Sequence, residues 1–145
     1  MVVFTAVVVL VLGLCIALVI LIAKDRGPAP VDVAVSYELA WDRLDFEGLW
    51  SLSAAELRDG LDRHEFVSRK RAAYANQRAL RELGADVAVE DHAQRGDIAT
   101  VTTRVDLPDG SSARNRTVLV RRAGRWQVAA YQLIASQVAE RLTSS

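Results

Sequence analysis

The 145-residue chain lacks the residues on which several large protein classes depend. It contains one cysteine, so no intrachain disulfide can form and a disulfide-stapled scaffold is excluded. No P-loop, dinucleotide-binding or G-x-S-x-G sequence occurs in it. Its hydrophobic share of 51% is too high for an intrinsically disordered chain. A chain of this length has room for one ordinary domain.

Residues for metal or nucleic-acid binding are also scarce. His64 and His92 are the only histidines, and neither has acidic or cysteine neighbours at ligand spacing beyond those of its own charged surface, so we expect no metal and no cofactor. Basic and acidic residues balance at 18 each, and aromatic residues do not interleave with the basic ones, which argues against nucleic acid. Cys15 lies in an apolar run and is not expected to act as a nucleophile. We therefore predict no catalytic residue.

The first 23 residues are the most distinctive part of the chain. Residues 2–23 carry no charge, and as a helix they would span about 33 Å, enough for a bilayer core. No basic residue precedes the run, and Lys24-Asp25-Arg26 follows it in place of a small-residue cleavage site, which disfavours a cleaved signal peptide. We predict an uncleaved transmembrane anchor over residues 1–23 and a single-pass location in the cell membrane.

The residues after this run set the orientation and distance of the domain. Lys24 and Arg26 favour a C-terminal domain on the cytoplasmic side, with the extracytoplasmic side left open. Gly27-Pro28-Ala29-Pro30 cannot continue a helix, so residues 24–30 are interpreted as a short, stiff linker. We expect the bilayer itself, contacted through residues 2–23, to be one partner of the chain.

Helical periodicity follows the linker. In residues 31–44 the apolar positions Ala34, Tyr37, Trp41 and Leu44 recur at intervals of three and four, and Asp32 is placed to cap the helix.

Further helix signals occupy residues 45–84. Leu49, Trp50 and Leu52 form a short second apolar element. Capping-box patterns at 53–56 and 62–65 predict two further helix starts, the last helix running to about Arg81 with a basic surface.

The second half of the chain alternates with period two, as half-buried strands do. Turn sequences separate strands expected at 85–94, 97–107, 112–122 and 125–134. Residues 135–145 are interpreted as a C-terminal tail. Helices before strands predict an α+β fold: an N-terminal transmembrane helix, then helices packed on a curved, four-stranded antiparallel sheet.

The sequence of residues 37–52, YELAWDRLDFEGLWSL, resembles the opening of the nuclear-transport-factor-two-like superfamily, in which an aromatic helix precedes an acidic turn and a second short helix. The likeness covers residues 31–134 and includes the closing sequence Gly124-Arg125-Trp126-Gln127-Val128. It implies a cone-like, strongly bent sheet around an interior cavity. Many small bacterial members have a single membrane anchor, and the excess of arginine over lysine suits a bacterial genome. Sheet faces in this superfamily often form dimers, which makes a homodimer one expected partner state.

The superfamily includes ketosteroid isomerase, so its catalytic residues can be compared with the corresponding positions of this chain. Tyr37 falls where the isomerases place an oxyanion-hole tyrosine. Their general base would fall in residues 53–61, which are helix-forming here, and their second, acidic oxyanion donor would fall in residues 117–120, which contain no acid. Tyr37 is therefore interpreted as a core residue.

Two groups of residues are candidates for binding. An interior cavity would be lined by Tyr37, Trp41, Trp50, Tyr74, Trp126 and Tyr131. The alternative is that these side chains simply fill the core. A basic docking surface would consist of Arg63, Arg69, Lys70, Arg71 and Arg78. These residues could form a docking surface for an acidic protein, a contact for lipid headgroups, or simply a solvated face.

Taken together, these patterns favour a non-catalytic, membrane-anchored accessory or assembly domain that interacts with a membrane protein complex. Two alternatives use the interior cavity. One is the binding of a small apolar ligand, and the other is an isomerase- or dehydratase-like reaction.

Overall fold

A computed structural model describes residues 7, 11–18, 27–76 and 86–137 of the chain. Helices precede strands, as predicted, and the fold is α+β. The helical half comprises α2 (Pro30–Asp42), α3 (Phe46–Leu52), the 3-10 helix η1 (Ala55–Leu57) and α4 (Arg63–Ala73). The sheet comprises β1 (Asp86–Arg95), β2 (Ile98–Asp106), β3 (Ser112–Arg122) and β4 (Arg125–Gln137). Strand β4 extends three residues into the predicted tail.

The predicted membrane anchor lies mostly outside the described residues, which include only Val7 and residues 11–18 of it. Among the helices of the described ranges, none is long and apolar enough to cross a membrane.

The start of α2 differs from its prediction. Pro30 occupies the first turn, where its missing N–H is not needed, and Ala29 is the N-cap with no side-chain bond. Asp32 lies inside the first turn, so its predicted role as N-cap is wrong. The fixed backbone of Pro30 begins the helix two residues before Asp32, and the aspartate instead places a negative charge near the positive end of the helix dipole.

Of the two predicted capping boxes, one is confirmed. Asp62 accepts from the Glu65 backbone N–H (2.8 Å), and the Glu65 carboxylate accepts from that of Asp62 (3.3 Å). Ser53 instead terminates α3: its hydroxyl donates to the Leu49 carbonyl (2.6 Å), and its backbone bridges to Val128 in β4. The predicted capping box at 53–56 is therefore wrong.

Helix α4 is shorter than predicted. It ends at Ala73, with Tyr74 as C-cap, and residues 74–76 form a turn, so a continuous helix to Arg81 is wrong. The rest of that prediction, from residue 77 onward, lies outside the described residues.

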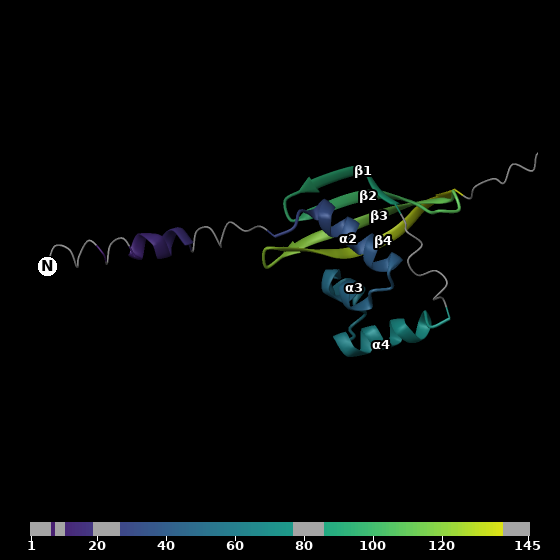
Figure 1. Ribbon diagram of the computed structural model, residues 1–145, viewed down its shortest axis with the longest axis horizontal. Helices are drawn as coiled ribbons and strands as arrows, with labels where there is room; N and C mark the ends of the chain where they lie inside the picture. The colour runs from purple at the N-terminus through teal and green to yellow at the C-terminus, as the bar shows by residue number, and fades with distance from the viewer. Residues whose placement is uncertain (1–6, 8–10, 19–26, 77–85, 138–145) are drawn as a thin grey trace, which may run out of the picture.

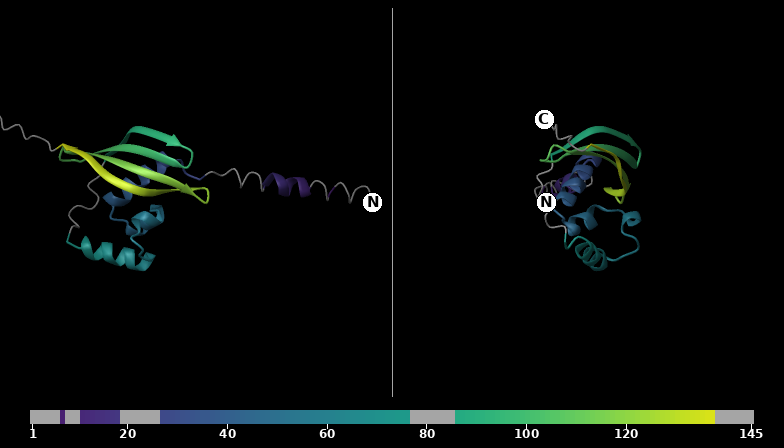
Figure 2. Two further views of the ribbon diagram at one scale, coloured as in Figure 1. Left: turned by 180° about the vertical axis from the view of Figure 1, so that it is seen from behind. Right: turned by 90° about the vertical axis from the view of Figure 1, so that its right-hand side faces the viewer.

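The sheet is an antiparallel meander in the order β1-β2-β3-β4. Its register shifts once in β1, between Val89 and Asp91, and twice between β3 and β4. Such bulges bend strands and increase twist, and the end-on view in Figure 2 shows the sheet arched over α2.

The elements form layers on one side of the sheet. Helix α2 contacts all four strands, and α3 packs between α2 and α4 (Figure 1). The core between them consists of Val33, Ala34, Tyr37, Ala40, Phe46, Leu49, Phe66, Val67, Ala99, Val101, Leu119, Trp126 and Val128. Both views agree that α2 begins at the end of the sheet that carries the β1–β2 and β3–β4 turns (Figures 1 and 2).

Candidate functional site

A buried carboxylate lies at the centre of the interface between α2 and the sheet. Glu38 is only 5% exposed and meets side chains from three strands, Thr103 of β2, Asn115 of β3 and Tyr131 of β4. The Thr103 hydroxyl donates to Oε1 (2.6 Å), and the Tyr131 hydroxyl donates to Oε2 (2.7 Å). The Asn115 amide lies 3.1 Å from Oε1 and 3.3 Å from Oε2. We call these four residues the Glu38 cluster.

Strand pairing brings the donors of the Glu38 cluster together. Thr103 pairs directly with Asn115 across β2 and β3, so both side chains point to the same face. Tyr131 pairs with Thr117, the next inward residue of β3 after Asn115. The three donors therefore come from adjacent strands and point towards α2.

The hydrogen bonds of this cluster use the acceptor capacity of the carboxylate. Each oxygen has one hydroxyl donor and shares the Asn115 amide, which approaches the roughly four lone-pair sites of a carboxylate. A buried charge is costly without such bonds. The arrangement stabilises Glu38 in place, and its hydrogen bonds connect α2 to strands β2, β3 and β4.

Burial also fixes the protonation of the neighbouring phenols. Loss of solvation raises the pKa of Tyr131 far above its usual value, and the adjacent Glu38 carboxylate raises it further. Burial raises the pKa of Tyr37 in the same direction. Tyr131 therefore stays a hydrogen-bond donor to Glu38 at neutral pH, and it keeps its proton to a higher pH than a solvated tyrosine would.

Sequence reasoning did not identify Glu38, although a signal was present. Glu38 follows Ala34 by four residues and precedes Trp41 by three, so it lies on the apolar stripe of α2. A carboxylate on such a stripe predicts a buried, hydrogen-bonded charge. The strand segment 117–120 does lack an acid, but α2 brings one to the interior beside it. The Thr117 hydroxyl is buried and has no hydrogen-bond partner in the described part of the chain.

Four of the predicted cavity-lining residues contact one another. The Tyr37 ring lies 5.2 Å from that of Tyr131 and 6.5 Å from that of Trp41, and the Trp41 ring lies 5.6 Å from that of Tyr74. These rings pack on one another, and Tyr131 belongs to the Glu38 cluster. Their role in lining a ligand site stays a prediction.

The other two predicted lining residues lie apart. Trp50 packs on Phe66 between α3 and α4, with ring centres 5.4 Å apart. Trp126 lies near the β3–β4 turn, where the Arg121 guanidinium is 5.3 Å from its ring centre. The structure thus does not gather all six aromatic residues around one space.

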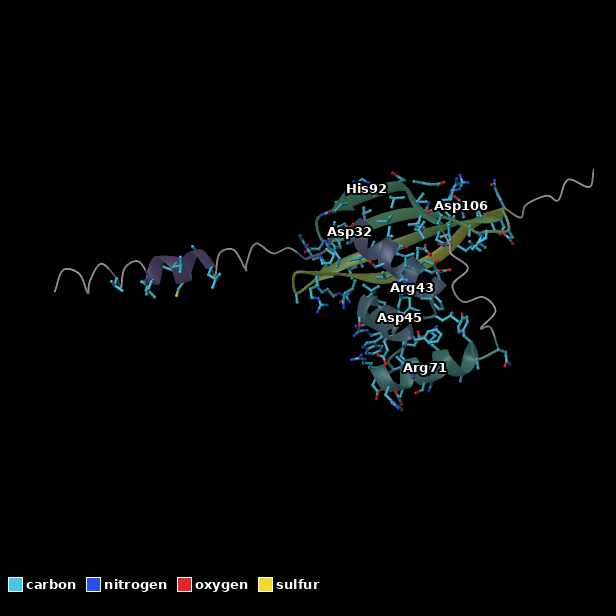
Figure 3. All side chains as sticks on the ribbon, viewed as in Figure 1. Asp32, Arg43, Asp45, Arg71, His92 and Asp106 are labelled. Carbon is cyan, nitrogen blue, oxygen red and sulfur yellow. The ribbon has the colours of Figure 1, made fainter. Side chains whose placement is uncertain are left out.

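An open groove of about 330 Å³ runs between α2 and α3 on their solvent side. It is lined by Ser36, Leu39, Ala40, Arg43, Asp45, Gly48, Ser51 and Leu52. Figure 3 places Arg43 and Asp45 at the junction of the two helices. The groove is separate from the Glu38 cluster, whose carboxylate is directed to the sheet.

The predicted basic docking surface is divided. Arg63 is paired with Glu47 of α3 (Nε to Oε2, 2.6 Å), and the Lys70 amine lies 5.4 Å from the Trp41 ring centre. Arg69 and Arg71 are exposed, but they are about 200° apart around the helix and therefore lie on opposite flanks. Arg78 lies outside the described residues.

The two histidines lie on different elements. His64 of α4 and His92 of β1 are both exposed, and Figure 3 shows His92 on the strand farthest from α4. Within the described ranges, no three His, Cys, Asp or Glu side chains are close enough together to hold a metal ion.

Comparison with known proteins gives two distant structural neighbours. One is a SEC-C motif containing protein from Rhodopseudomonas palustris, with 20% identity, a TM-score of 0.48, and coverage of 71% of this chain and 77% of the other. The second is an NTF-2 like protein of unknown function from Silicibacter pomeroyi, with 18% identity, a TM-score of 0.47, and coverage of 70% and 90%. No family model and no curated protein matches the chain.

Proposed function

We propose that the chain is a non-catalytic, membrane-anchored accessory or assembly domain that works through its surface, in contact with a membrane protein complex. The observation that carries this proposal is the Glu38 cluster. Its buried carboxylate accepts hydrogen bonds from three of the chain's own side chains, which supports a structural role for Glu38.

The membrane anchor is supported by the apolar run at residues 2–23. In its described part, Val7, Val11, Leu12, Leu14, Ile16 and Leu18 are each more than half exposed. A helix that is apolar all round needs a lipid or protein environment to cover it. Because Lys24 and Arg26 follow the run, we place the domain on the cytoplasmic side of the cell membrane.

The resemblance to the nuclear-transport-factor-two-like superfamily supports the same proposal. A bent antiparallel sheet with helices on one face is the architecture that this resemblance implies, and its small bacterial members often act behind a single anchor. We propose that this chain is a member of that superfamily.

The test is purification of the tagged full chain in mild detergent, followed by mass spectrometry of proteins and small molecules. We expect a membrane protein at a fixed stoichiometry and no equimolar small molecule. An equimolar apolar molecule that is lost in Ala40→Trp would contradict the proposal and support the ligand-binding alternative. Turnover of such a molecule that is lost in Tyr37→Phe would support the enzyme alternative.

A paired variant tests the anchor itself. Leu12→Arg with Leu14→Arg places two charges in the middle of the apolar run, each costing about 2.5–3.5 kcal/mol at a helix centre. This variant should leave the membrane pellet during alkaline carbonate extraction, whereas Leu12→Ala with Leu14→Ala should stay in it. Extraction of the unaltered chain would contradict membrane anchoring.

A further inference from the structure

Arginines gather at the end of the sheet where α2 begins. We define the turn end as the β1–β2 and β3–β4 turns and the strand residues beside them. It carries Arg95, Arg121, Arg122 and Arg125. The two turns are joined by a hydrogen bond from the Arg121 backbone N–H to the Asp97 carbonyl (2.8 Å). The four arginines thus lie on one connected part of the molecule (Figure 1).

Half of this positive charge is neutralised within the chain. The Arg121 guanidinium binds the Asp97 carboxylate (2.7 Å), and Arg122 binds Glu56 of η1 (Nη1 to Oε2, 2.9 Å). Arg95 and Arg125 are exposed, and within the described residues neither side chain has an ion pair or hydrogen bond.

The charge of Arg125 is added beside that of Arg122. The two residues are directly opposite in the β3–β4 register, and Glu56 offsets the charge of Arg122 only. Asp32 lies in the first turn of α2, the helix that begins at this end of the sheet (Figure 3). The turn end therefore has a net positive charge, to which Lys24-Asp25-Arg26 adds one further unit in the sequence.

An apolar side chain accompanies the charges. Ile98, the first residue of β2, is 56% exposed and pairs with Val120 on the face of the sheet away from the helices. An aliphatic side chain can enter the lipid headgroup region while neighbouring guanidinium groups stay at its polar surface.

The length of the linker determines what the turn end can reach. Only residues 24–29 separate the apolar run from Pro30. Fully extended, six residues span about 20 Å at most. The headgroup layer is itself roughly 5–7 Å thick on each side, and charges interact over about 8–10 Å at physiological salt. A domain whose turn end faces the linker is therefore held within reach of the headgroups.

We propose that the turn end docks on the anionic phospholipid headgroups of the bilayer that residues 2–23 enter. Arg95 and Arg125 contact the phosphates, and Ile98 enters the interface between them. This inference rests on the proposed membrane anchoring. It assigns the lipid contact to the end of the sheet and not to α4, which lies beyond α3 with its free arginines on opposite flanks (Figure 2).

The test uses the full chain in Cys15→Ser background, with Ile98→Cys carrying an environment-sensitive fluorophore. The protein is reconstituted into vesicles of phosphatidylcholine alone or with phosphatidylglycerol, each doped with a headgroup-attached quencher. We expect strong quenching only in the anionic vesicles, weakened by high salt. Arg95→Glu with Arg125→Glu should lower the ratio of docked to undocked protein by at least roughly 30-fold.

The matched control is Arg69→Glu with Arg71→Glu on α4, which changes the net charge equally and should leave the quenching unchanged. Equal quenching in neutral vesicles, or an equal loss in the α4 variant, would overturn the proposal. Carbonate extraction of the same vesicles separates the two failures. Protein that is released shows that the anchor has failed, whereas inserted protein without quenching in any vesicle overturns docking alone and leaves an acidic protein as the partner of these arginines.

Discussion

The Glu38 cluster and the turn end handle charge in opposite ways. Under α2 a single carboxylate is buried and bonded to three side chains, while at the turn end two of four arginines have no partner among the described residues. A charge withdrawn from water must be satisfied within the chain, and its main effect is on stability. A charge left in water contributes little to stability and remains able to bind something else. The Glu38 cluster therefore stabilises the fold, whereas Arg95 and Arg125 of the turn end are available for binding.

Glu38→Ala should have the largest effect on the free energy of unfolding. The variant leaves Thr103, Asn115 and Tyr131 without their shared acceptor in a buried site, and we expect a loss of about 3–5 kcal/mol in the free energy of unfolding. Tryptophan fluorescence during urea unfolding of the full chain in detergent measures it. A loss below about 1 kcal/mol would show that the cluster is not a structural tie.

Tyr131→Phe should have the next largest effect. It removes one hydrogen bond to a charged acceptor, which is typically worth about 1.5–3 kcal/mol. Thr117→Val is the matched control, because its buried hydroxyl has no hydrogen-bond partner among the described residues and its loss should be neutral or stabilising. Equal losses in both variants would mean that the Tyr131 hydroxyl contributes by filling space alone.

Alkaline pH should weaken the interior and leave the turn end unchanged. The pKa values of Tyr131 and Tyr37 are raised in the folded chain, so the folded state keeps protons that the unfolded state loses. Their contribution is complete below the unfolded pKa of about 10 and is lost as the pH rises above it. Unfolding midpoints from pH 8 to 11.5 should fall above pH 10, and less steeply in Tyr131→Phe. A midpoint that rises with pH would contradict these directions.

A smaller change tests the N-terminal cap of α4. Asp62→Ala removes the confirmed capping box of α4 and should cost about 1 kcal/mol. Ser68→Ala, at an exposed position of the same helix, should change the free energy of unfolding by less than about 0.5 kcal/mol. Equal effects would show that the Asp62 cap adds nothing beyond surface propensity.

The smallest expected stability change is that of Arg125→Ala. Removing an exposed arginine that faces Arg122 should leave the free energy of unfolding within about 0.5 kcal/mol of the parent value or raise it slightly. A loss above about 1 kcal/mol would mean that Arg125 supports the fold and is not a free surface charge.

Local periodicity predicted much of this fold. The alternation of residues from 97 to 134 located three strands to within a few residues, because each has one buried and one exposed face. Asp62 and Ser53 began similar capping patterns, but only Asp62 caps a helix. The backbone of Ser53 pairs with distant Val128, and this tertiary contact is invisible in a local motif.

The candidate site was harder to predict than the fold. The position of Glu38 on the stripe of α2 was readable, but its partners lie 65, 77 and 93 residues away, and only strand register brings them together. The turn end was missed for the same reason. Arg95 and Arg125 are distant in sequence and are brought to one end of the sheet by strand pairing. The predicted surface on α4 was based on basic residues that are close in sequence but point in different directions around the helix.

Amide hydrogen exchange of the full chain, compared between detergent micelles and nanodiscs that contain phosphatidylglycerol, tests the central claim most directly. We expect anionic lipid to increase the protection of backbone amides in the two turns, at residues 95–98 and 121–126. Protection in α2 and in the strand residues of the Glu38 cluster should not change. Greater protection around Glu38 without a change at the turns would contradict this claim, because the interior and not the turn end would then be the part that binds.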